Sequence, residues 1–181
     1  MEIAGEVQMD RGIARFADGV ADYRPIWSVI EDDFYAEVKA QFQTEGEEGG
    51  DKWPELSPEY AGWKEIHYPG QPMLQRSGDL YRSLTTSTDP NAVVKEERKT
   101  LTLGSRVPYG IFHQSPDPRG SNLPRRPVIQ LTEAFKRTTM HHIQTYLVQI
   151  ASQSGFRTGL GPLDVSRLAG ARARQGGYFQ R

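Results

Sequence analysis

The stretch Leu74-Gln-Arg-Ser-Gly-Asp-Leu-Tyr-Arg-Ser-Leu84 carries the clearest local signal in this chain. Ser77 can cap a short helix that continues through Leu80 and Leu84, because a serine hydroxyl accepts a hydrogen bond from a backbone amide of the first helical turn. Gly78 is expected to permit a tight backbone at the same point. The stretch therefore predicts a turn of the chain followed by a short helix.

A long helix is predicted on each side of this stretch. Pro25 suits a first helical turn, and apolar side chains then recur every four residues, as an amphipathic helix over residues 25–43 requires. These side chains are Ile26, Ile30, Phe34, Val38 and Phe42. A second long helix is predicted over residues 132–153.

A β-hairpin is predicted between the short helix and the last one. Val93, Leu101 and Leu103 fit a half-buried sheet, with residues 92–97 and 100–104 paired around Arg98-Lys99. The predicted fold class is α+β, with a small, mostly antiparallel sheet within residues 85–112. Two long helices flank the sheet, and extended loops and a C-terminal arm complete the chain.

The remaining segments give weaker signals. Ile3, Val7 and Met9 alternate weakly and predict a short edge strand over residues 2–9. Asp10 is a plausible cap for a first helix over residues 11–22. Prolines between residues 53 and 72 predict little regular structure beyond one turn of helix at 58–64.

Length and composition limit the class of protein. With 181 residues the chain matches one ordinary domain, expected over residues 1–154, followed by a Gly/Arg-rich arm over 155–181. The absence of cysteine excludes disulfides, thiolate metal sites and Cys nucleophiles. No apolar run reaches the ~20 residues of a membrane helix, and no signal-peptide pattern is present. We therefore expect assembly in a cytoplasm.

The charge is divided unequally along the chain. Residues 1–65 hold 16 acidic and 6 basic side chains, whereas residues 66–181 hold 7 acidic and 16 basic ones. Such a division suggests head-to-tail contact between copies, or one face toward a basic partner and another toward an acidic one. The alternative is two solvated surfaces that neutralise each other within one fold.

Three further segments accompany the 74–84 stretch. Trp53-Pro-Glu-Leu56 precedes it, with Tyr60 and Lys64 following; Val107-Pro-Tyr-Gly-Ile-Phe-His-Gln114 and Leu123-Pro-Arg-Arg-Pro127 come after it. In this order and spacing the segments resemble the phage virion morphogenesis family, the tail-completion proteins of Mu-like and P2-like phages. The resemblance covers roughly residues 25–152.

The resemblance implies a structural virion protein with no active site, metal or cofactor. It implies a ring, often six-fold, at the junction of head and tail, where it completes the tail so that the tail can join a filled capsid. The implied partners are further copies of the chain, the tail tube or tail terminator protein, and head-connector or neck proteins. The positions with an implied interface or structural role are Trp53, Tyr60, Ser77, Gly78, Leu80, Tyr109, His113, Gln114, Pro124, Arg126 and Pro127.

His113 invites a rival interpretation as the base of a hydrolase, with Asp117 nearby. A general base needs a positioned partner and a nucleophile within reach, and the nearby serines lie in no nucleophile-elbow motif. The resemblance instead places Tyr109 and His113-Gln114 at the end of a short segment where the chain turns. A glycine commonly follows the His-Gln pair in the family, but here residues 115–120 intervene, so this loop is altered or longer.

Two tryptophans flank the proline-rich segment. Trp53 and Trp63 could clamp a ligand or nucleic acid, but large rings also supply burial where regular structure is scarce, and the second interpretation is favoured. His141 and His142 are adjacent on a helix and so point about 100° apart, too far to share a metal.

Arg126 matches the arginine of the family's Pro-x-Arg-Pro element. A guanidinium between two prolines can bind a carboxylate bidentately, so we expect a partner in the acidic loop 45–51 or on the acidic helix face, in this chain or in the next subunit. The arginines of the arm could instead contact DNA within the tail lumen, although protein docking is favoured. The alternatives are thus a tail terminator or a DNA-binding assembly factor.

Overall fold

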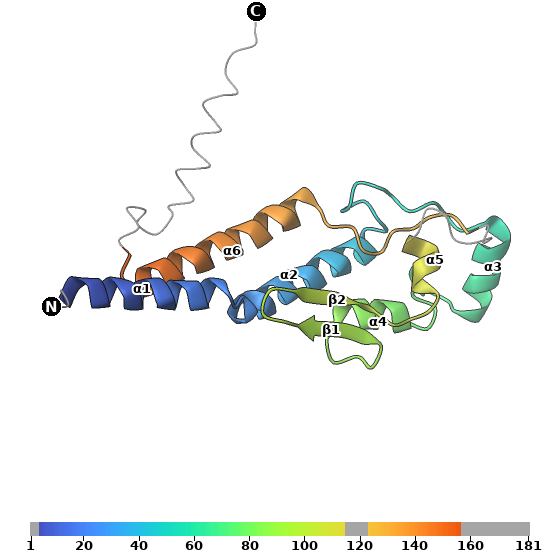
Figure 1. Cartoon of the computed structure of the whole chain (residues 1–181). Helices are drawn as coiled ribbons and strands as arrows, with labels where there is room; N and C mark the ends of the chain where they lie inside the picture. The colour runs from blue at the N-terminus through green and yellow to red at the C-terminus, as the bar shows by residue number, and fades with distance from the viewer. Residues whose placement is uncertain (1–3, 115–122, 157–181) are drawn as a thin grey trace, which may run out of the picture. The chain divides into compact units, whose positions relative to one another are not determined.

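The computed structural model describes residues 4–114 and 123–156 of the chain (Figure 1). The elements in this part are α1 (Ala4–Val20), α2 (Arg24–Gln43), α3 (Pro58–His67), α4 (Asp79–Thr85), β1 (Ala92–Glu96), β2 (Leu101–Ser105), α5 (Gly110–Gln114) and α6 (Glu133–Gln153). The fold is therefore α+β, as predicted. The chain divides into two compact units, one of residues 21–142 and one of residues 1–20 and 143–181.

Helix α2 supplies the core of the unit formed by residues 21–142. Four side chains of its predicted apolar stripe are buried, from Ile30 to Phe42, whereas Ile26 is half-buried. Pro25 lies in the first turn, where no backbone N–H is needed. The stripe packs against α4 and against single residues from three loops. The resulting cluster consists of Phe34, Val38, Phe42, Trp53, Leu80, Leu84, Val107 and Val128. The predicted helix 25–43 is confirmed.

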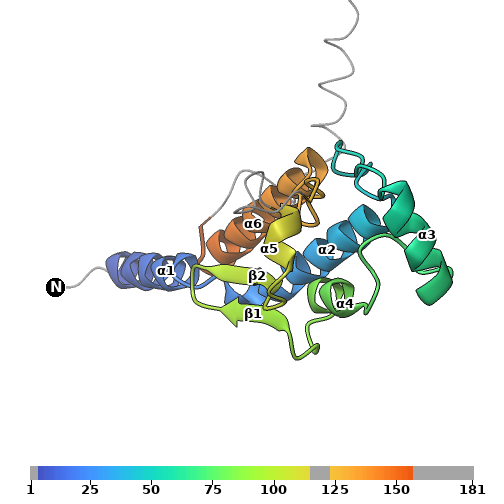
Figure 2. The ribbon, with the colours of Figure 1, turned by 90° about the vertical axis from the view of Figure 1, so that its right-hand side faces the viewer.

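Strands β1 and β2 form the predicted antiparallel hairpin, with Ala92 opposite Ser105 and Glu96 opposite Leu101. The amide of Glu97 closes the turn by donating to the carbonyl of Thr100 at 2.8 Å. Trp27 of α2 donates its indole N–H to the Glu97 carbonyl at 2.7 Å, which fixes the start of α2 to the turn. Figure 2 shows the hairpin beside α2 and α4.

The start of α4 differs in one detail from the prediction. Gly78 occupies the N-cap position with a φ of +76°, in the left-handed region that favours glycine, so its predicted role is confirmed. The left-handed residue moves Ser77 out of the capping position. The Ser77 hydroxyl accepts from the Asp79 amide at a long 3.4 Å and lies 3.5 Å from the Tyr109 hydroxyl, so Ser77 is not the cap that the sequence predicted.

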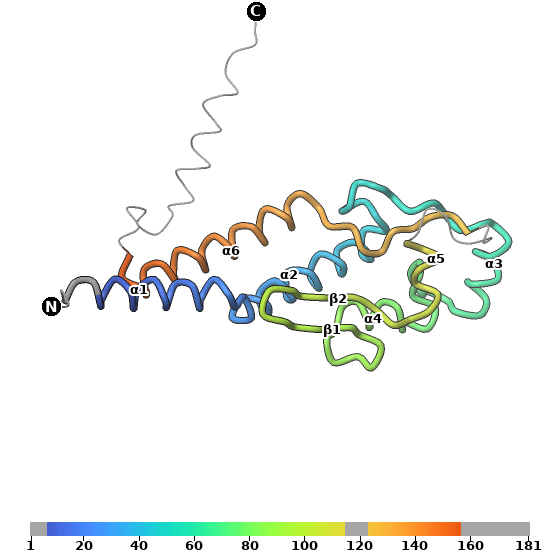
Figure 3. Tube along the Cα trace, in the orientation of Figure 1, coloured from blue at the N-terminus to red at the C-terminus, as the bar shows by residue number. Residues whose placement is uncertain are grey.

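An extended segment, residues 123–132, leads into α6 and covers the end of α2. Gln41 and Trp53 both donate to the carbonyl oxygen of Pro127, at 3.1 and 3.0 Å, and Gln130 donates to the Gly49 carbonyl at 2.5 Å. Figure 3 shows this trace running beside the loop that follows α2. The residues preceding it, 115–122, include the altered loop and lie outside the described residues, as does the arm from residue 157 onward.

In the other unit, α1 packs antiparallel to the last turns of α6. The helices approach closely where glycine faces the neighbour: a Cβ on Gly12 would lie 2.6 Å from the Ser154 carbonyl oxygen. Tyr146 donates its hydroxyl to the Gly19 carbonyl at 3.4 Å. The predicted edge strand is wrong, since residues 4–9 are helical and Asp10 lies within α1. Packing on α6 favours a helix here, whereas a strand would lack a partner among the described residues.

Candidate functional site

A cavity of about 780 Å³ lies in the unit of residues 21–142, within the size range of ligand pockets. Its wall is built by α3, by the residues that lead into α3, by the turn before α4 and by the region around α5. Six residues that the sequence singled out line it: Tyr60, Ser77, Tyr109, His113, Pro124 and Arg126. The cavity thus brings together motifs that are far apart in the sequence: Arg126 is hydrogen-bonded to Pro54, 72 residues earlier.

Arg126 is buried in the wall of this cavity, with 4% of its surface exposed. Its guanidinium donates to the carbonyls of Pro54 and Glu55, at 2.8 and 2.9 Å, and its backbone amide donates to the His113 carbonyl at 3.0 Å. Burial lowers the pKa of Arg126 from its usual range. The arginine therefore fastens the Trp53-Pro-Glu-Leu56 segment to the segment that follows α5.

The predicted carboxylate partner of Arg126 is not among its contacts in the described part of the chain. The proline-rich backbone explains the difference, because an irregular chain leaves carbonyls without a ladder partner and a guanidinium satisfies two of them at once. A partner in another subunit stays a prediction.

Lys64 is the second buried cation of the cavity, with 7% of its surface exposed. Its ammonium donates to the carbonyls of Gln71 and Pro72, at 2.6 and 2.7 Å. Burial lowers the pKa of Lys64, and the charges of Glu45 and Glu65 oppose this effect. Neither carboxylate forms an ion pair with the ammonium. Among the residues described, the hydrogen-bond partners of both buried cations are thus backbone carbonyls, and neither cation forms an ion pair.

The two residues of the His-Gln pair in α5 have different contacts: His113 lines the cavity, and Gln114 is hydrogen-bonded to backbone. Burial lowers the pKa of His113, and the nearby charge of Arg126 lowers it further. The buried Nδ1 of His113 has no hydrogen-bond partner in the described part of the chain. Gln114 is not among the lining residues and instead binds the backbone of Val128 and Ile129. No described side chain is hydrogen-bonded to His113 as a hydrolase base would require.

Helix α3 presents an aromatic stack beside the cavity. The rings of Tyr60 and Trp63 lie 5.6 Å apart and those of Trp63 and His67 lie 4.5 Å apart, both pairs nearly parallel. Trp63 is 40% exposed and Ile66 is 79% exposed. The burial interpretation is thus confirmed for Trp53, which is 2% exposed, and wrong for Trp63. The reason is that α3 turns Lys64 rather than Trp63 toward the protein interior.

The comparison with protein families decides the identity of the chain. The model of the phage virion morphogenesis family matches residues 6–148. This chain belongs to that family. The match begins within α1, earlier than the resemblance over residues 25–152, and ends within α6. Neither the curated proteins nor the solved structures contain a match.

For this family member, the sequence motifs identify most but not all of the cavity's polar groups. Lys64 stands in the sequence as a neighbour of the motif without an assigned role. Its spacing of four residues from Tyr60 is the signal that could have placed it, because residues four apart share a helix face. Gln41, which is buried and binds both Gly49 and Pro127, gives no such signal on an otherwise apolar stripe.

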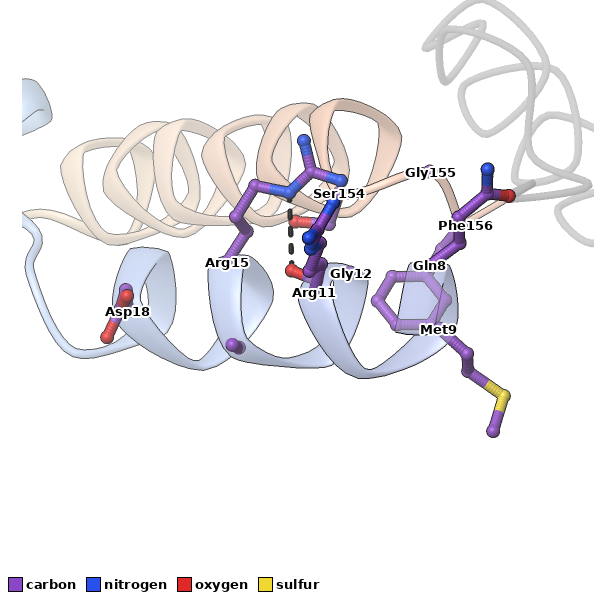
Figure 4. Close-up of a pocket in the computed structure, with 10 residues that line it drawn as sticks. Gln8, Met9, Arg11, Gly12, Arg15, Asp18, Ser154, Gly155 and Phe156 are labelled. Carbon is purple, nitrogen blue, oxygen red and sulfur yellow. Dashed lines mark hydrogen bonds between the residues drawn. The ribbon is translucent and has the colours of Figure 1, made fainter. Parts of the chain in front are cut away.

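A second hollow of the family member, of about 930 Å³, lies in the unit that contains α1 (Figure 4). Arg11, Arg15 and Asp18 line it with exposed side chains, and Phe156 packs edge-on against Phe16 at 5.6 Å. Arg15 donates to the Arg11 carbonyl at 3.3 Å. No charged side chain among the described residues is buried in its wall, so the first cavity is the stronger candidate site.

Other ligand-binding arrangements find little support in the described residues. His142 of α6 is hydrogen-bonded to Asp33 of α2 at 2.9 Å, a contact that sequence spacing did not indicate. No group of three or more His, Cys, Asp or Glu side chains in the described ranges is placed to hold a metal. None of the helices described is long and apolar enough to cross a membrane.

Proposed function

We propose that this chain is a structural virion protein of the neck or tail end, where it completes the tail and joins it to the head by forming a closed ring. Membership of the phage virion morphogenesis family carries this proposal. A ring at this junction needs surfaces that bind copies of the chain and surfaces that bind the neighbouring rings.

The apolar surface of α3 and α5 suits such contacts. Trp63 and Ile66 on α3, and Ile111 and Phe112 on α5, are large apolar side chains exposed to solvent. Aromatic side chains are enriched at protein interfaces, and several on one surface mark a binding site more often than single ones do. This surface can bury area against another subunit without any change of fold.

The division of charge supports contact between unlike surfaces. The acidic first third and the basic remainder of the chain can attract each other between adjacent copies. In a ring each copy then presents one surface to each neighbour, which is a heterologous interface that closes on itself.

We propose no enzymatic role. His113 has a pKa lowered by burial, as catalytic groups often do, but structural burial has the same effect. The described part of the chain supplies neither an orienting carboxylate nor a nucleophile hydrogen-bonded to His113. The His113→Ala variant discriminates between an enzyme and a structural protein, because an enzyme that uses His113 would lose its activity and still fold and assemble.

The copy number of the chain in purified virions, measured by quantitative mass spectrometry against the portal protein, tests the proposal. A fixed number of roughly six or twelve copies is expected for a closed ring. Absence from the finished particle would contradict a structural role. Particles made without the chain discriminate further: tails of normal length that fail to join filled heads indicate completion, whereas overlong tails indicate a terminator.

A further inference from the structure

Neither buried cation of the cavity beside α3 forms an ion pair with a described residue, although Glu55 also lines the cavity with an exposed side chain. Lys64 and Arg126 are both more than nine-tenths buried and line the same wall, and their side-chain partners among the described residues are four backbone carbonyls. Carbonyl dipoles satisfy hydrogen-bond donors but do not cancel two positive charges in a region of low dielectric. A carboxylate that enters the cavity would neutralise this charge and meet donors that are already in position.

The rest of the lining specifies what must accompany the carboxylate. Leu56, Leu74 and Leu123 contribute aliphatic side chains, and Tyr60 and Tyr109 contribute rings. His113 also lines the cavity, and its buried Nδ1 has no hydrogen-bond partner among the described residues. A free small anion would leave this apolar surface uncovered, so the fitting occupant is a peptide segment with an acidic side chain between apolar ones.

The chain itself contains such a segment outside the described residues. Residues 157–181 follow the last described residue, Phe156, and hold a single acidic side chain, Asp164. Asp164 lies between Leu163 and Val165 in the sequence Leu160-Gly-Pro-Leu-Asp-Val165. Pro162 restricts the backbone before it, which reduces the conformational entropy that binding must overcome.

We propose that residues 160–165 of one copy bind in the cavity of a neighbouring copy, with the Asp164 carboxylate facing Lys64 and Arg126 and the flanking apolar side chains covering the leucines and tyrosines. The inference rests on the proposed function in one respect, since the donor is an adjacent copy in the assembled ring. Each copy then gives one segment and receives one, which links the ring in a closed cycle.

Photo-crosslinking of the full chain tests the contact directly. A benzophenone amino acid replaces Leu163 in one preparation and Gln175, in the same terminal segment, in a control preparation. Crosslinks from position 163 are expected at the peptides that contain Tyr109, His113 and Leu123, and the control should give at least about fivefold fewer there, because a bound segment fixes one position far more than a distant one. Equal crosslinking from both positions would overturn the proposal.

Isotope mixing identifies the donor. When ¹⁴N- and ¹⁵N-labelled copies are assembled together, a segment from a neighbour gives crosslinked pairs of mixed isotope. Pairs of one isotope only would show that the segment binds its own chain, which contradicts the neighbour as donor. This result is distinguishable from failure of the proposed function, because the copy number per virion is measured independently.

A double-mutant cycle tests the charge pairing in solution. Asp164→Asn and Lys64→Met should each weaken self-association of the full chain by about tenfold or more, and the double variant should be no weaker than either single one. If Lys64→Met fails to fold, Arg76→Gln replaces it in the cycle, because Arg76 is an exposed cation of the same cavity wall. Glu48→Gln and Lys52→Met remove exposed charges elsewhere and should have no effect. Additive losses in the double variant would overturn the pairing.

Discussion

Gln114 and Ile129 form a reciprocal pair of hydrogen bonds through one side-chain amide. The Ile129 amide donates to Oε1 of Gln114 at 3.0 Å, and Nε2 of Gln114 donates to the Ile129 carbonyl at 2.6 Å. The Val128 amide donates to the same Oε1, also at 3.0 Å. The side chain thus replaces a strand partner for the segment that follows Pro127. The second residue of the His-Gln motif is therefore a backbone clamp.

Replacement of Gln114 by glutamate should be strongly destabilising. The variant keeps the shape but exchanges the donor that faces the Ile129 carbonyl for a charged oxygen, in a partly buried position. We expect a loss of about 2–4 kcal/mol in the free energy of unfolding, measured by urea denaturation. Gln144→Glu, on the exposed face of α6, is the matched control and should change stability by less than about 0.5 kcal/mol. Equal losses in both variants would contradict the clamp.

The left-handed backbone at Gly78 gives a second test. A Cβ there would meet the flexible end of Arg82 at 2.8 Å and would strain a φ of +76°, so Gly78→Ala should destabilise the chain by about 1–2 kcal/mol. Gly62→Ala is the control: Gly62 lies inside α3 with nothing near its absent Cβ, and alanine favours a helix by up to about 1 kcal/mol. The two variants should therefore shift the midpoint of thermal unfolding in opposite directions.

His113 should make stability depend on pH below neutrality. Its pKa in the folded chain is lowered from the usual 6.5, first by burial and then by the charge of Arg126. The unfolded chain therefore binds more protons below pH 6.5, and folded stability should fall as the pH falls through 6.5. Above 6.5 the effect should be absent, because both states hold a neutral ring.

The measurement is the thermal midpoint from pH 8 to pH 5 for the parent chain and for His113→Gln, with His141→Gln as the matched control. The decline below pH 6.5 should become shallower in His113→Gln and stay unchanged in His141→Gln. An unchanged slope in His113→Gln would assign the pH dependence to other groups.

The parts of the fold that sequence could predict are those that local patterns determine. The four-residue recurrence from Ile26 to Phe42 predicts α2. The apolar Val93, Leu101 and Leu103 on either side of Arg98-Lys99 predict the hairpin. Each pattern depends on neighbours along the chain. The edge strand at 2–9 failed because packing of α1 on α6 through Gly12 and Gly19 is a long-range contact. The sequence motifs singled out six of the residues that line the cavity. They could not predict the carbonyl partners of Lys64 and Arg126, because those contacts depend on the tertiary fold.

A substitution beside the exposed aromatic stack of α3 can test assembly without disturbing folding. Ile66 lies on this helix with most of its side chain in solvent, so Ile66→Glu removes no core contact and should leave the unfolding midpoint within about 0.5 kcal/mol of the parent. If the surface binds another subunit, the same change buries a carboxylate in an apolar interface and should reduce infectious titre and virion incorporation severely. Val94→Glu makes the same kind of change on the hairpin, where the predicted effect on titre is small. Full incorporation of Ile66→Glu would exclude α3 as an interface and restrict the subunit contacts to other surfaces.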